Sequence, residues 1–352
     1  MKIPGKILLL GSGETSPVGG HVFESLIQTM PSSPVISILE TPAGFELNSS
    51  KVAEKVGNFL QTRLQNYQPK IHLIPARKKG TKFSPDNIEV LRPILKSNIL
   101  YMGAGSPTYA IRQLEDSLAW DLLRAKHLFG ATLILASAAI IAAGKLSIPV
   151  YEIFKVGEDP HWVRGLDLLA PFGFSLVFVP HWNNREGGSD LDTSRCYLGL
   201  ERFLPLITDL PEGVKIIGLD ELTALLIDFS TEICEVLGRD SIHIIDRSGE
   251  KHYSSGSKFS INELGNYIPF NGRQTEISDF AWSEVEIAEV SNVHAAERLV
   301  PEEIEKLVNE RQSARDARDW KRADDMRKRI EESGWQVKDT PTGPLIEFVE
   351  FD

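Results

Sequence analysis

The chain has 352 residues, more than the about 250 to 300 at which a single hydrophobic core usually stops growing, so we expect two domains. Its composition, 42% hydrophobic and 25% charged, is that of a soluble globular protein and excludes the disordered, fibrous and membrane classes. The formal net charge of -11 excludes tight binding of nucleic acid by the molecule as a whole, because such binding needs Lys and Arg against phosphates. A local basic surface stays compatible with this charge.

Cysteine usage and hydropathy point to a cytoplasmic protein. Cys196 and Cys234 have no Cys-x-x-Cys spacing, which predicts neither a disulfide framework nor a thiolate zinc site and fits a reducing compartment. The apolar run before Gly11 leads into Gly-Ser-Gly-Glu without a cleavage site, so we expect a buried strand and not a signal peptide. Residues 128–144 are the longest other apolar stretch and fall short of the roughly 20 residues of a membrane span, so we predict none.

Short apolar runs alternate with helix-like segments over about the first half of the chain. Continuous Ile, Leu and Val without alternation is typical of parallel strands buried on both faces. These runs are 6–10, 35–39, 71–74, 98–102, 131–136 and 176–179. Residues 51–65 and 87–96 have apolar residues three and four apart, which predicts helices packed on a sheet. The alternation predicts a doubly wound, mostly parallel α/β sheet.

The pattern changes after about residue 216. Residues 222–228, 235–237 and 241–245 are short strand-like pieces, and the sequence Asp-Arg-Ser-Gly at 246–249 predicts the tight turn of an antiparallel hairpin. Residues 251–293 are polar and weakly patterned. We expect them to form the edge of the first domain and a linker.

From Pro301 the chain becomes a dense mixture of both charge signs. Pro301 before two glutamates is typical of a helix start. One apolar stripe starts at Ile304, and a second follows Asp319, an N-cap residue type, and ends before Gly334. We expect two short antiparallel helices and then a β-hairpin over 335–351 with its turn at 340–343.

Ser137 is a candidate nucleophile because it follows the most apolar predicted strand and precedes a helix of small residues. A serine at such a turn presents its hydroxyl above the carboxyl edge of the sheet, and the following helix N-terminus stabilises negative charge. Leu135 and Ala139 stand where the Gly-x-Ser-x-Gly pattern has glycine. Close helix packing is the alternative reason for Ser-Ala-Ala after a strand.

His181 and the pair Asp220-Glu221 also follow predicted strands. His181 follows 176–179 with only Pro180 between them, and the acidic pair follows a strand over 215–218. Open α/β sheets place ligands at this carboxyl edge. A carboxylate there can orient an imidazole and stabilise its protonated form, as in Ser-His-acid catalysis. A loop histidine with a structural partner and an exposed acidic turn are the alternatives.

Together these segments resemble the dipeptidase E and cyanophycinase family, whose fold is that of the class I glutamine amidotransferases. The resemblance covers about residues 5–245, and five segments occur in the family's order. They are Leu-Leu-Leu-Gly-Ser-Gly-Glu at 8–14, Gly-Ala-Gly-Ser-Pro at 103–107, Ala-Ser-Ala-Ala at 136–139, His-Trp at 181–182 with Arg185, and Gly-Leu-Asp-Glu-Leu-Thr-Ala at 218–224. The family's corresponding stretches look like Gly-Gly-Asn-Gln, Thr-Ser-Ala-Gly-Ala, Gln-His-Phe and Gly-Ile-Asp-Glu-x-Thr-Ala.

The resemblance implies a serine hydrolase that needs no metal and no organic cofactor. It makes Ser137 the nucleophile, His181 the general base and then acid, and Glu221 the orienting acid. Family members cleave short peptides or isopeptides with aspartyl residues through an acyl-enzyme. The positions that match the oxyanion-hole and substrate-binding stretches are Gly13, Gly103, Ala104, Gly105, Ser106, Ala138 and Arg185.

The chain departs from the family at two of these stretches. Ser106-Pro107 replaces Asn-Gln, and Ala139 replaces a glycine, which leaves open both the substrate specificity and a catalytically silent relative. Gly11-Ser12-Gly13 also suggests a dinucleotide loop. Its third glycine is absent, because Ser16 stands there, so we expect no dinucleotide cofactor.

Residues 302–348 resemble the extreme C-terminal piece of bacterial cysteinyl-tRNA synthetases. The similar stretches are 311–324 and Asp-Thr-Pro-Thr-Gly at 339–343, and none of the synthetase's aminoacylating parts accompanies them. Basic residues could contact an RNA backbone and an aromatic ring could stack on a base, whereas a mixed-charge helical face is usually just solvated. The candidate residues are Arg311, Arg315, Arg318, Trp320, Lys321 and Arg322.

Two functions follow as hypotheses. The first is a cytoplasmic serine hydrolase of peptidase or amidase type acting on a small peptide or amide, aspartyl-containing in the family. The alternative is a non-catalytic amidotransferase-like protein that binds tRNA or a translation partner through its C-terminal module, which could also bind a second copy of the chain. We expect a hydrolase domain over 1–250, edge and linker over 251–297, and the C-terminal module over 298–352.

Overall fold

The computed structural model describes residues 3–274, 276–296, 300–340 and 343–349. The chain forms two compact units, Met1–Val285 and Glu286–Asp352. None of the helices in the described ranges has the length and hydropathy that crossing a bilayer requires.

The first unit is built on a mixed sheet, which has eight strands in the described part of the chain, in the order β14-β11-β10-β1-β5-β4-β2-β3. The five strands from β1 to β3 in this order are parallel, and β10, β11 and β14 join them antiparallel. The predicted mostly parallel α/β sheet is therefore confirmed. The strands are β1 (Ile7–Leu10), β2 (Val35–Leu39), β3 (Lys70–Ile74), β4 (Ile99–Met102), β5 (Thr132–Ala136), β10 (Thr223–Asp228), β11 (Ile233–Gly238) and β14 (Lys258–Ser260).

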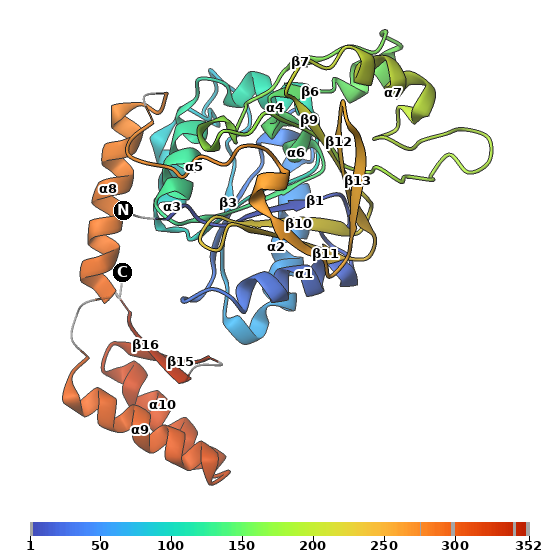
Figure 1. Cartoon of the computed structure of the whole chain (residues 1–352). Coiled ribbons are helices and arrows are strands. Elements are labelled where there is room, and N and C mark those ends of the chain that lie inside the picture. Colours follow the sequence, from blue (N-terminus) through green and yellow to red (C-terminus); the bar gives the residue numbers. More distant parts are fainter. Residues whose placement is uncertain (1–2, 275, 297–299, 341–342, 350–352) are drawn as a thin grey trace. The chain divides into compact units, whose positions relative to one another are not determined.

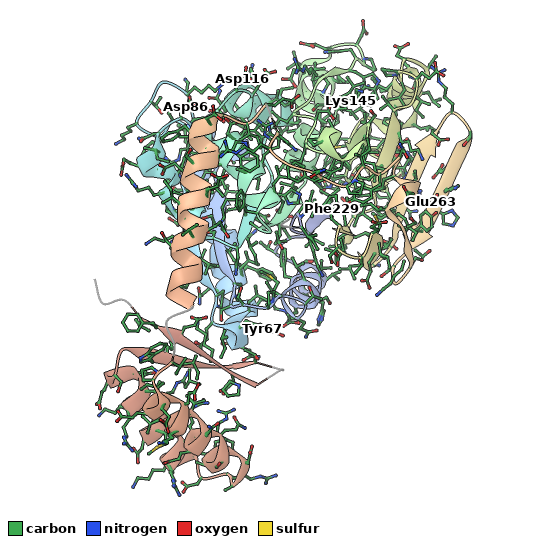
Figure 2. The ribbon with its side chains drawn as sticks, turned by 60° about the vertical axis from the view of Figure 1, so that its left-hand side comes forward. Tyr67, Asp86, Asp116, Lys145, Phe229 and Glu263 are labelled. Atoms are coloured by element: carbon green, nitrogen blue, oxygen red, sulfur yellow. The ribbon has the colours of Figure 1, made fainter. Side chains whose placement is uncertain are left out.

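Helices cover both faces of this sheet, as Figure 1 shows for α1 and α2 on one side of β1 and β10 and for α5 and α6 on the other. On the first face Phe23 of α1 and Leu60 of α2 pack in one cluster with Leu8 of β1 and Ile38 of β2. The two strand residues share this face because alternate residues of a strand point the same way. Phe229 lies in the interior of the unit, while Glu263 lies at its periphery (Figure 2). The helices are α1 (Pro17–Ile27), α2 (Ser49–Arg63), α3 (Ile88–Lys96), α4 (Pro107–Leu114), α5 (Leu118–Leu128) and α6 (Ala138–Ala143).

A second sheet contains the strand that precedes His181. Its order is β13-β12-β9-β8, from β8 (Leu176–Val179), β9 (Lys215–Leu219), β12 (Ser241–Asp246) and β13 (Gly249–Ser254). The sequence pattern grouped β8 with the parallel strands of the first sheet, but β10 occupies the place beside β1, and β8 pairs in parallel with β9. The predicted hairpin at 246–249 is present between β12 and β13. Helix α7 (Gly199–Thr208) packs on this sheet through Phe203 and Leu206.

Shorter elements lie between the larger ones along the chain. Strands β6 (Leu146–Ser147) and β7 (Val163–Arg164) pair with each other. Four 3-10 turns are present in the described residues, with one π-helical turn. The 3-10 turns are η1 (Thr41–Ala43), η2 (Gln65–Tyr67), η4 (Ala170–Phe172) and η5 (Ile261–Glu263), and the π-helical turn is η3 (Glu152–Val156).

Helix α8 (Asp279–Ala296) lies in the stretch where the sequence pattern indicated an edge and a linker. Its residues Trp282 and Val285 are buried, whereas Phe280 and Ile287 are exposed. The apolar side chains therefore do not form one stripe, and this explains why helical spacing was not recognised in the sequence.

Beyond the part of α8 that it includes, the second unit contains two helices and a β-hairpin, as the sequence predicts. These are α9 (Glu302–Asp316), α10 (Trp320–Glu332), β15 (Trp335–Thr340) and β16 (Gly343–Phe348). The Asp319 side chain caps α10, and Gly334 follows it with a φ of 80°. The core consists of Ile304, Val308, Ile330, Trp335 and Val337. The tip of the predicted turn, 341–342, and the predicted end of the hairpin at 350–351 lie outside the described residues.

Candidate active site

Ser137 occupies a strained turn between β5 and α6. Its backbone has φ 50° and ψ -116°, a conformation that is rare for any residue other than glycine. Its amide nitrogen donates to the Leu10 carbonyl over 3.3 Å, which holds the turn against β1. Strained strand-to-helix turns present the serine in hydrolases with a nucleophile elbow. Leu135 and Ala139, which stand where that pattern has glycine, are both buried.

His181 connects Ser137 with Glu221. The Ser137 hydroxyl lies 3.1 Å from Nε2 of His181, and the Nδ1 of His181 lies 3.2 Å from Oε1 of Glu221. A hydrogen on Nδ1 is donated to the carboxylate and leaves Nε2 free to accept from the hydroxyl. His181 also has a positive φ, 52°, and its amide donates to the Gly11 carbonyl over 3.2 Å. Three side chains distant in sequence thus form one chain of hydrogen-bond contacts at the junction of the two sheets.

Two asparagines hold Glu221, and neither was a candidate from the sequence. Asn184 is buried and donates to Oε1 of Glu221 over 2.7 Å, and the Glu221 amide donates to Oδ1 of Asn183 over 2.9 Å. The hydrogen bond from His181, with further help from Asn184, lowers the pKa of Glu221 below its ordinary value although partial burial acts in the opposite direction. The position of Asn183 and Asn184 two and three residues after His181 is the signal that could have identified them.

The Gly-Ser-Gly loop after β1 contacts the turn that carries Glu221 and the start of β10. The Gly11 amide donates to the Thr223 carbonyl over 2.8 Å, and the Ser12 hydroxyl accepts from the Leu222 amide over 3.0 Å. A side chain at Gly11 would overlap the carbonyl of Asp220. Gly13 has a φ of 76° and packs against Leu222. The glycines of this loop therefore permit a close backbone approach beside Glu221.

The loop after β4 lies beside Ser137, since the Gly103 carbonyl accepts from the Ala139 amide over 3.3 Å. The amide of Ala138 donates to no residue among those that the structure describes, so it is free to stabilise an oxyanion. A side chain at Gly105, whose φ is 150°, would overlap the carbonyl of Pro42. The candidate donors that remain in this loop are the amides of Gly103, Ala104 and Gly105.

The predicted oxyanion role of Ser106 needs a correction. Its amide already donates to the Pro42 carbonyl over 2.9 Å, and its hydroxyl caps α4 by accepting from the Tyr109 amide over 3.2 Å. Pro107 follows as the first residue of α4. The Ser-Pro departure from the family is thus explained as a helix start. Arg185 is exposed on the loop after His181 and is not brought into the triad.

A small cavity of about 20 Å³ adjoins the 103–104 loop, enough for one water molecule. Its lining includes Tyr101, whose buried hydroxyl has no hydrogen-bond partner in the described part of the chain, together with Glu14. The Tyr197 ring lies 5.6 Å from the His181 ring. Among the described residues, no group of three or more His, Cys, Asp or Glu side chains is arranged to hold a metal ion.

The six candidate RNA-contact residues of the second unit do not share one environment. Arg311 is only 2% exposed and donates to both carboxylate oxygens of Asp339, over 2.8 and 2.9 Å, so it is not available to a phosphate. Arg315 lies 3.1 Å from the same carboxylate. Arg318, Lys321 and Arg322 are exposed, as is Trp320, at 58%. The prediction for Arg311 is therefore wrong, because a partner from the hairpin buries it.

The two units are similar to different known proteins. Residues 298–343 match the model of the cysteinyl-tRNA ligase anticodon binding domain. A crystal structure of a peptidase from an acI-B1 Actinobacterium is similar to 73% of this chain and 97% of its own, with a TM-score of 0.59 and 21% identity. A putative peptidase E protein from Listeria monocytogenes EGD-e matches 71% of this chain and 98% of its own, with a TM-score of 0.40 and 13% identity. The first unit therefore has the fold of a solved peptidase, and the C-terminal segment resembles an anticodon-binding domain.

Proposed function

We propose that the chain is a serine hydrolase of peptidase or amidase type that acts through an acyl-enzyme. The observation that carries the proposal is the relay in which the Ser137 hydroxyl lies 3.1 Å from His181 Nε2 and His181 Nδ1 lies 3.2 Å from Glu221 Oε1. The strained φ of Ser137 is a second support, because such strain persists mainly where function requires it. The fold shared with a solved peptidase is consistent with this chemistry.

The chemistry begins when Ser137 Oγ attacks the carbonyl carbon of a peptide or amide and its proton moves to His181 Nε2. Glu221 stabilises the imidazolium, while amides of Ala138 and of the 103–105 loop donate to the oxyanion. His181 then gives its proton to the leaving amine as the C–N bond breaks and the acyl-enzyme forms. In the second half, His181 takes a proton from water, the hydroxide attacks the ester, and the proton returns to Ser137 Oγ as the acid leaves.

We place this activity in the domain over 1–250, with the edge and linker over 251–297 and a separate module over 298–352. The substrate is a small peptide or amide, and an aspartyl residue in it follows from the resemblance to dipeptidase E and cyanophycinase. The free thiols of Cys196 and Cys234 fit a cytoplasmic location. Burial raises the pKa of each thiol to about 12, so neither acts as the nucleophile.

Reaction with a fluorophosphonate probe tests the proposal, because such probes phosphonylate an activated serine. We expect the wild type to be labelled on Ser137, and Ser137→Ala to lose the label. Ser189→Ala removes an exposed hydroxyl from a loop and serves as the matched control, with labelling unchanged. A folded wild type that takes up no probe would contradict the proposal.

A second candidate function rests on the match of residues 298–343 to an anticodon-binding domain. In it the first unit is a non-catalytic scaffold and the second unit binds tRNA or a translation partner. The exposed Trp320, Arg318 and Lys321 are the groups that would stack on a base and pair with phosphates. Acidic residues interleave with them, which keeps the local net charge low.

Retention of tRNA by the full chain at low salt tests this candidate. We expect retention that falls as salt rises, and a loss of retention in Trp320→Ala with Lys321→Glu. Lys328→Glu makes the same charge change on the same helix, where its side chain is 76% exposed, and should weaken retention less. No retention by the wild type at low salt would reject the RNA-binding function.

A further inference from the structure

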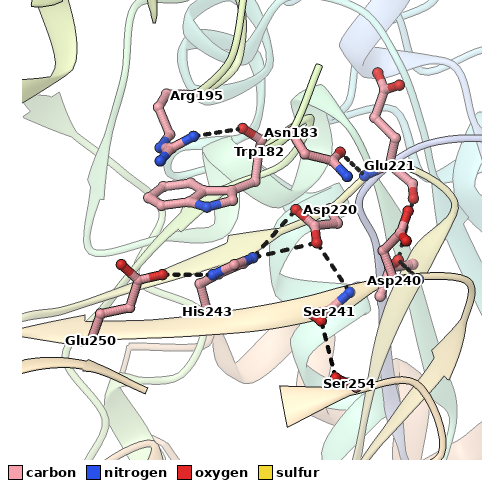
Figure 3. Close-up of polar contacts among 11 residues, drawn as sticks. Trp182, Asn183, Arg195, Asp220, Glu221, Asp240, Ser241, His243, Glu250 and Ser254 are labelled. Atoms are coloured by element: carbon pink, nitrogen blue, oxygen red, sulfur yellow. Dashed lines mark hydrogen bonds and ion pairs between the residues drawn. The ribbon is translucent and has the colours of Figure 1, made fainter. Parts of the chain in front are cut away.

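A second polar cluster lies next to Glu221 in the chain, around Asp220 and His243 (Figure 3). Asp220, which precedes Glu221, is buried, and its two carboxylate oxygens each lie 3.3 Å from Nε2 of His243 on β12. On the other side of the same imidazole, Nδ1 lies 2.7 Å from Oε1 of Glu250. The Ser241 amide donates to Asp220 Oδ2 over 3.1 Å. We call Trp182, Arg195, Asp220, His243 and Glu250 the His243 cluster.

The imidazole of His243 also supports the loop that carries His181. Its ring is stacked on Trp182 with the centroids 5.4 Å apart, and the guanidinium of Arg195 lies 4.0 Å from the centroid of the same indole. Figure 3 shows the indole between these two groups. Trp182 is held further by its amide, which donates to the Leu219 carbonyl over 3.0 Å. Because Trp182 follows His181 in the chain, this stacking restrains the position of His181.

Hydrogen-bond counting shows which form of His243 satisfies its neighbours. A neutral imidazole has one N–H, so it can donate to Asp220 or to Glu250 and turns a lone pair toward the other carboxylate. The imidazolium donates to both. The buried carboxylate of Asp220 also needs a positive partner, since an unpaired buried charge is costly. With His243 protonated, the two carboxylates of the cluster are balanced by two cations, His243 and Arg195.

The environment of His243 favours this charged form. Burial alone would lower the pKa of His243, but the hydrogen bonds and charges of Asp220 and Glu250 outweigh it and raise the pKa above its ordinary value. Two other charged or titratable groups belong to this setting. Arg195 lies across the indole, and His252 on β13 is directly opposite His243 in the strand register. The positive form is therefore present at low pH and is lost as the pH rises through the raised pKa.

We infer that His243 is a positioning residue of the proposed hydrolase, whose imidazolium holds the Asp220-Glu221 turn and the His181-Trp182 turn in the geometry of the relay. The inference rests on the proposed function for the catalytic use of the relay. The contacts by which His243 would position the two turns do not depend on that function. His243 touches neither Ser137 nor a reacting atom, so it acts through Asp220 and Trp182. The rate at which Ser137 reacts should accordingly depend on the protonation of a side chain outside the triad.

The pH profile of fluorophosphonate labelling tests this inference in the full chain. We expect the wild-type rate to decline on the alkaline side as His243 loses its proton. His243→Gln should react roughly tenfold more slowly, because the relay residues are no longer held in alignment. The rate of this variant should also lack the alkaline decline. His252→Gln makes the same substitution at the exposed position opposite on β13 and should retain both the rate and the decline. A merely structural role would lower the rate of His243→Gln and leave the shape of its profile unchanged.

Nuclear magnetic resonance separates failure of this inference from failure of the hydrolase proposal. The indole N–H of Trp182 and the ring protons of His181 should shift together with the titration of His243 in the wild type, and no longer do so in His243→Gln. If the wild type takes up no probe but these shifts occur, the hydrolase proposal fails and the positioning role stands. An alkaline decline that persists in His243→Gln, or Trp182 and His181 resonances indifferent to His243, would overturn the positioning role.

Discussion

Replacing Glu221 with glutamine should slow the reaction of Ser137 with a fluorophosphonate nearly a hundredfold. The amide oxygen of glutamine can take the place of Oε1 and accept from both Asn184 and His181, so the substitution removes charge and preserves shape. Two unit charges 3.2 Å apart attract by about 5 kcal/mol at an effective dielectric constant of about 20. We halve this value because 34% of the Glu221 side chain faces solvent. The remaining ~2.5 kcal/mol corresponds to nearly two powers of ten in rate.

The assay is the second-order rate constant of labelling, measured with the thermal stability of each variant. Glu201→Gln makes the same charge change at an exposed position in the first turn of α7 and should keep the wild-type rate. The expected loss should appear without a change in melting temperature. A folded Glu221→Gln that reacts within about threefold of the wild type would refute the claim that the carboxylate stabilises an imidazolium.

Three further substitutions test the geometry. Ser137→Gly should have a free energy of unfolding roughly 1 kcal/mol higher than that of Ser137→Ala in calorimetry, because glycine relieves the strained φ. Equal stabilities of the two variants would contradict the strain. Gly11→Ala should destabilise the first unit by more than about 2 kcal/mol in denaturant unfolding, since its methyl group would overlap the Asp220 carbonyl. Arg311→Met should lower the stability of the second unit by about 2 to 3 kcal/mol, less than a fully buried pair, because Asp339 is 42% exposed. The hydrogen bond from Arg311 lowers the pKa of Asp339. In the wild type the stabilisation by this pair should therefore be lost as the pH falls through that lowered pKa. A stability of the second unit that does not change at acid pH would contradict this expectation.

The three residues of the proposed relay could be selected as candidates from the sequence because each follows a predicted strand. Ser137 directly follows β5, and His181 and Glu221 each come two residues after the end of their strands, β8 and β9. Strand ends are a local signal, since a buried apolar run and the polar residue after it are adjacent in the chain. The partition into two sheets is not local. It depends on β10 pairing with β1 while β8 pairs with β9, and all four strands are mostly buried.

The residues that support the relay were missed for the same reason. Asn184 hydrogen-bonds to a carboxylate 37 positions away, and His243 contacts Asp220 across 23 positions. In the sequence His243 is an alternate residue of an antiparallel strand. This position alone does not show whether the side chain faces solvent or packs against an indole. Such residues become recognisable only when the neighbouring strand is known.

Arg311 shows how the same limit affects the proposed RNA surface. In a helix where acids and bases alternate, a buried arginine and a solvated one have the same sequence pattern, and only the hairpin that supplies Asp339 separates them. Because Arg311 is paired in this way, its replacement would destabilise the second unit and also reduce RNA retention without any contact to RNA. Trp320 and Lys321 are exposed, and substituting them leaves the core of the unit intact. A change in RNA retention at these two positions therefore reports on a surface, whereas a change at Arg311 reports on folding.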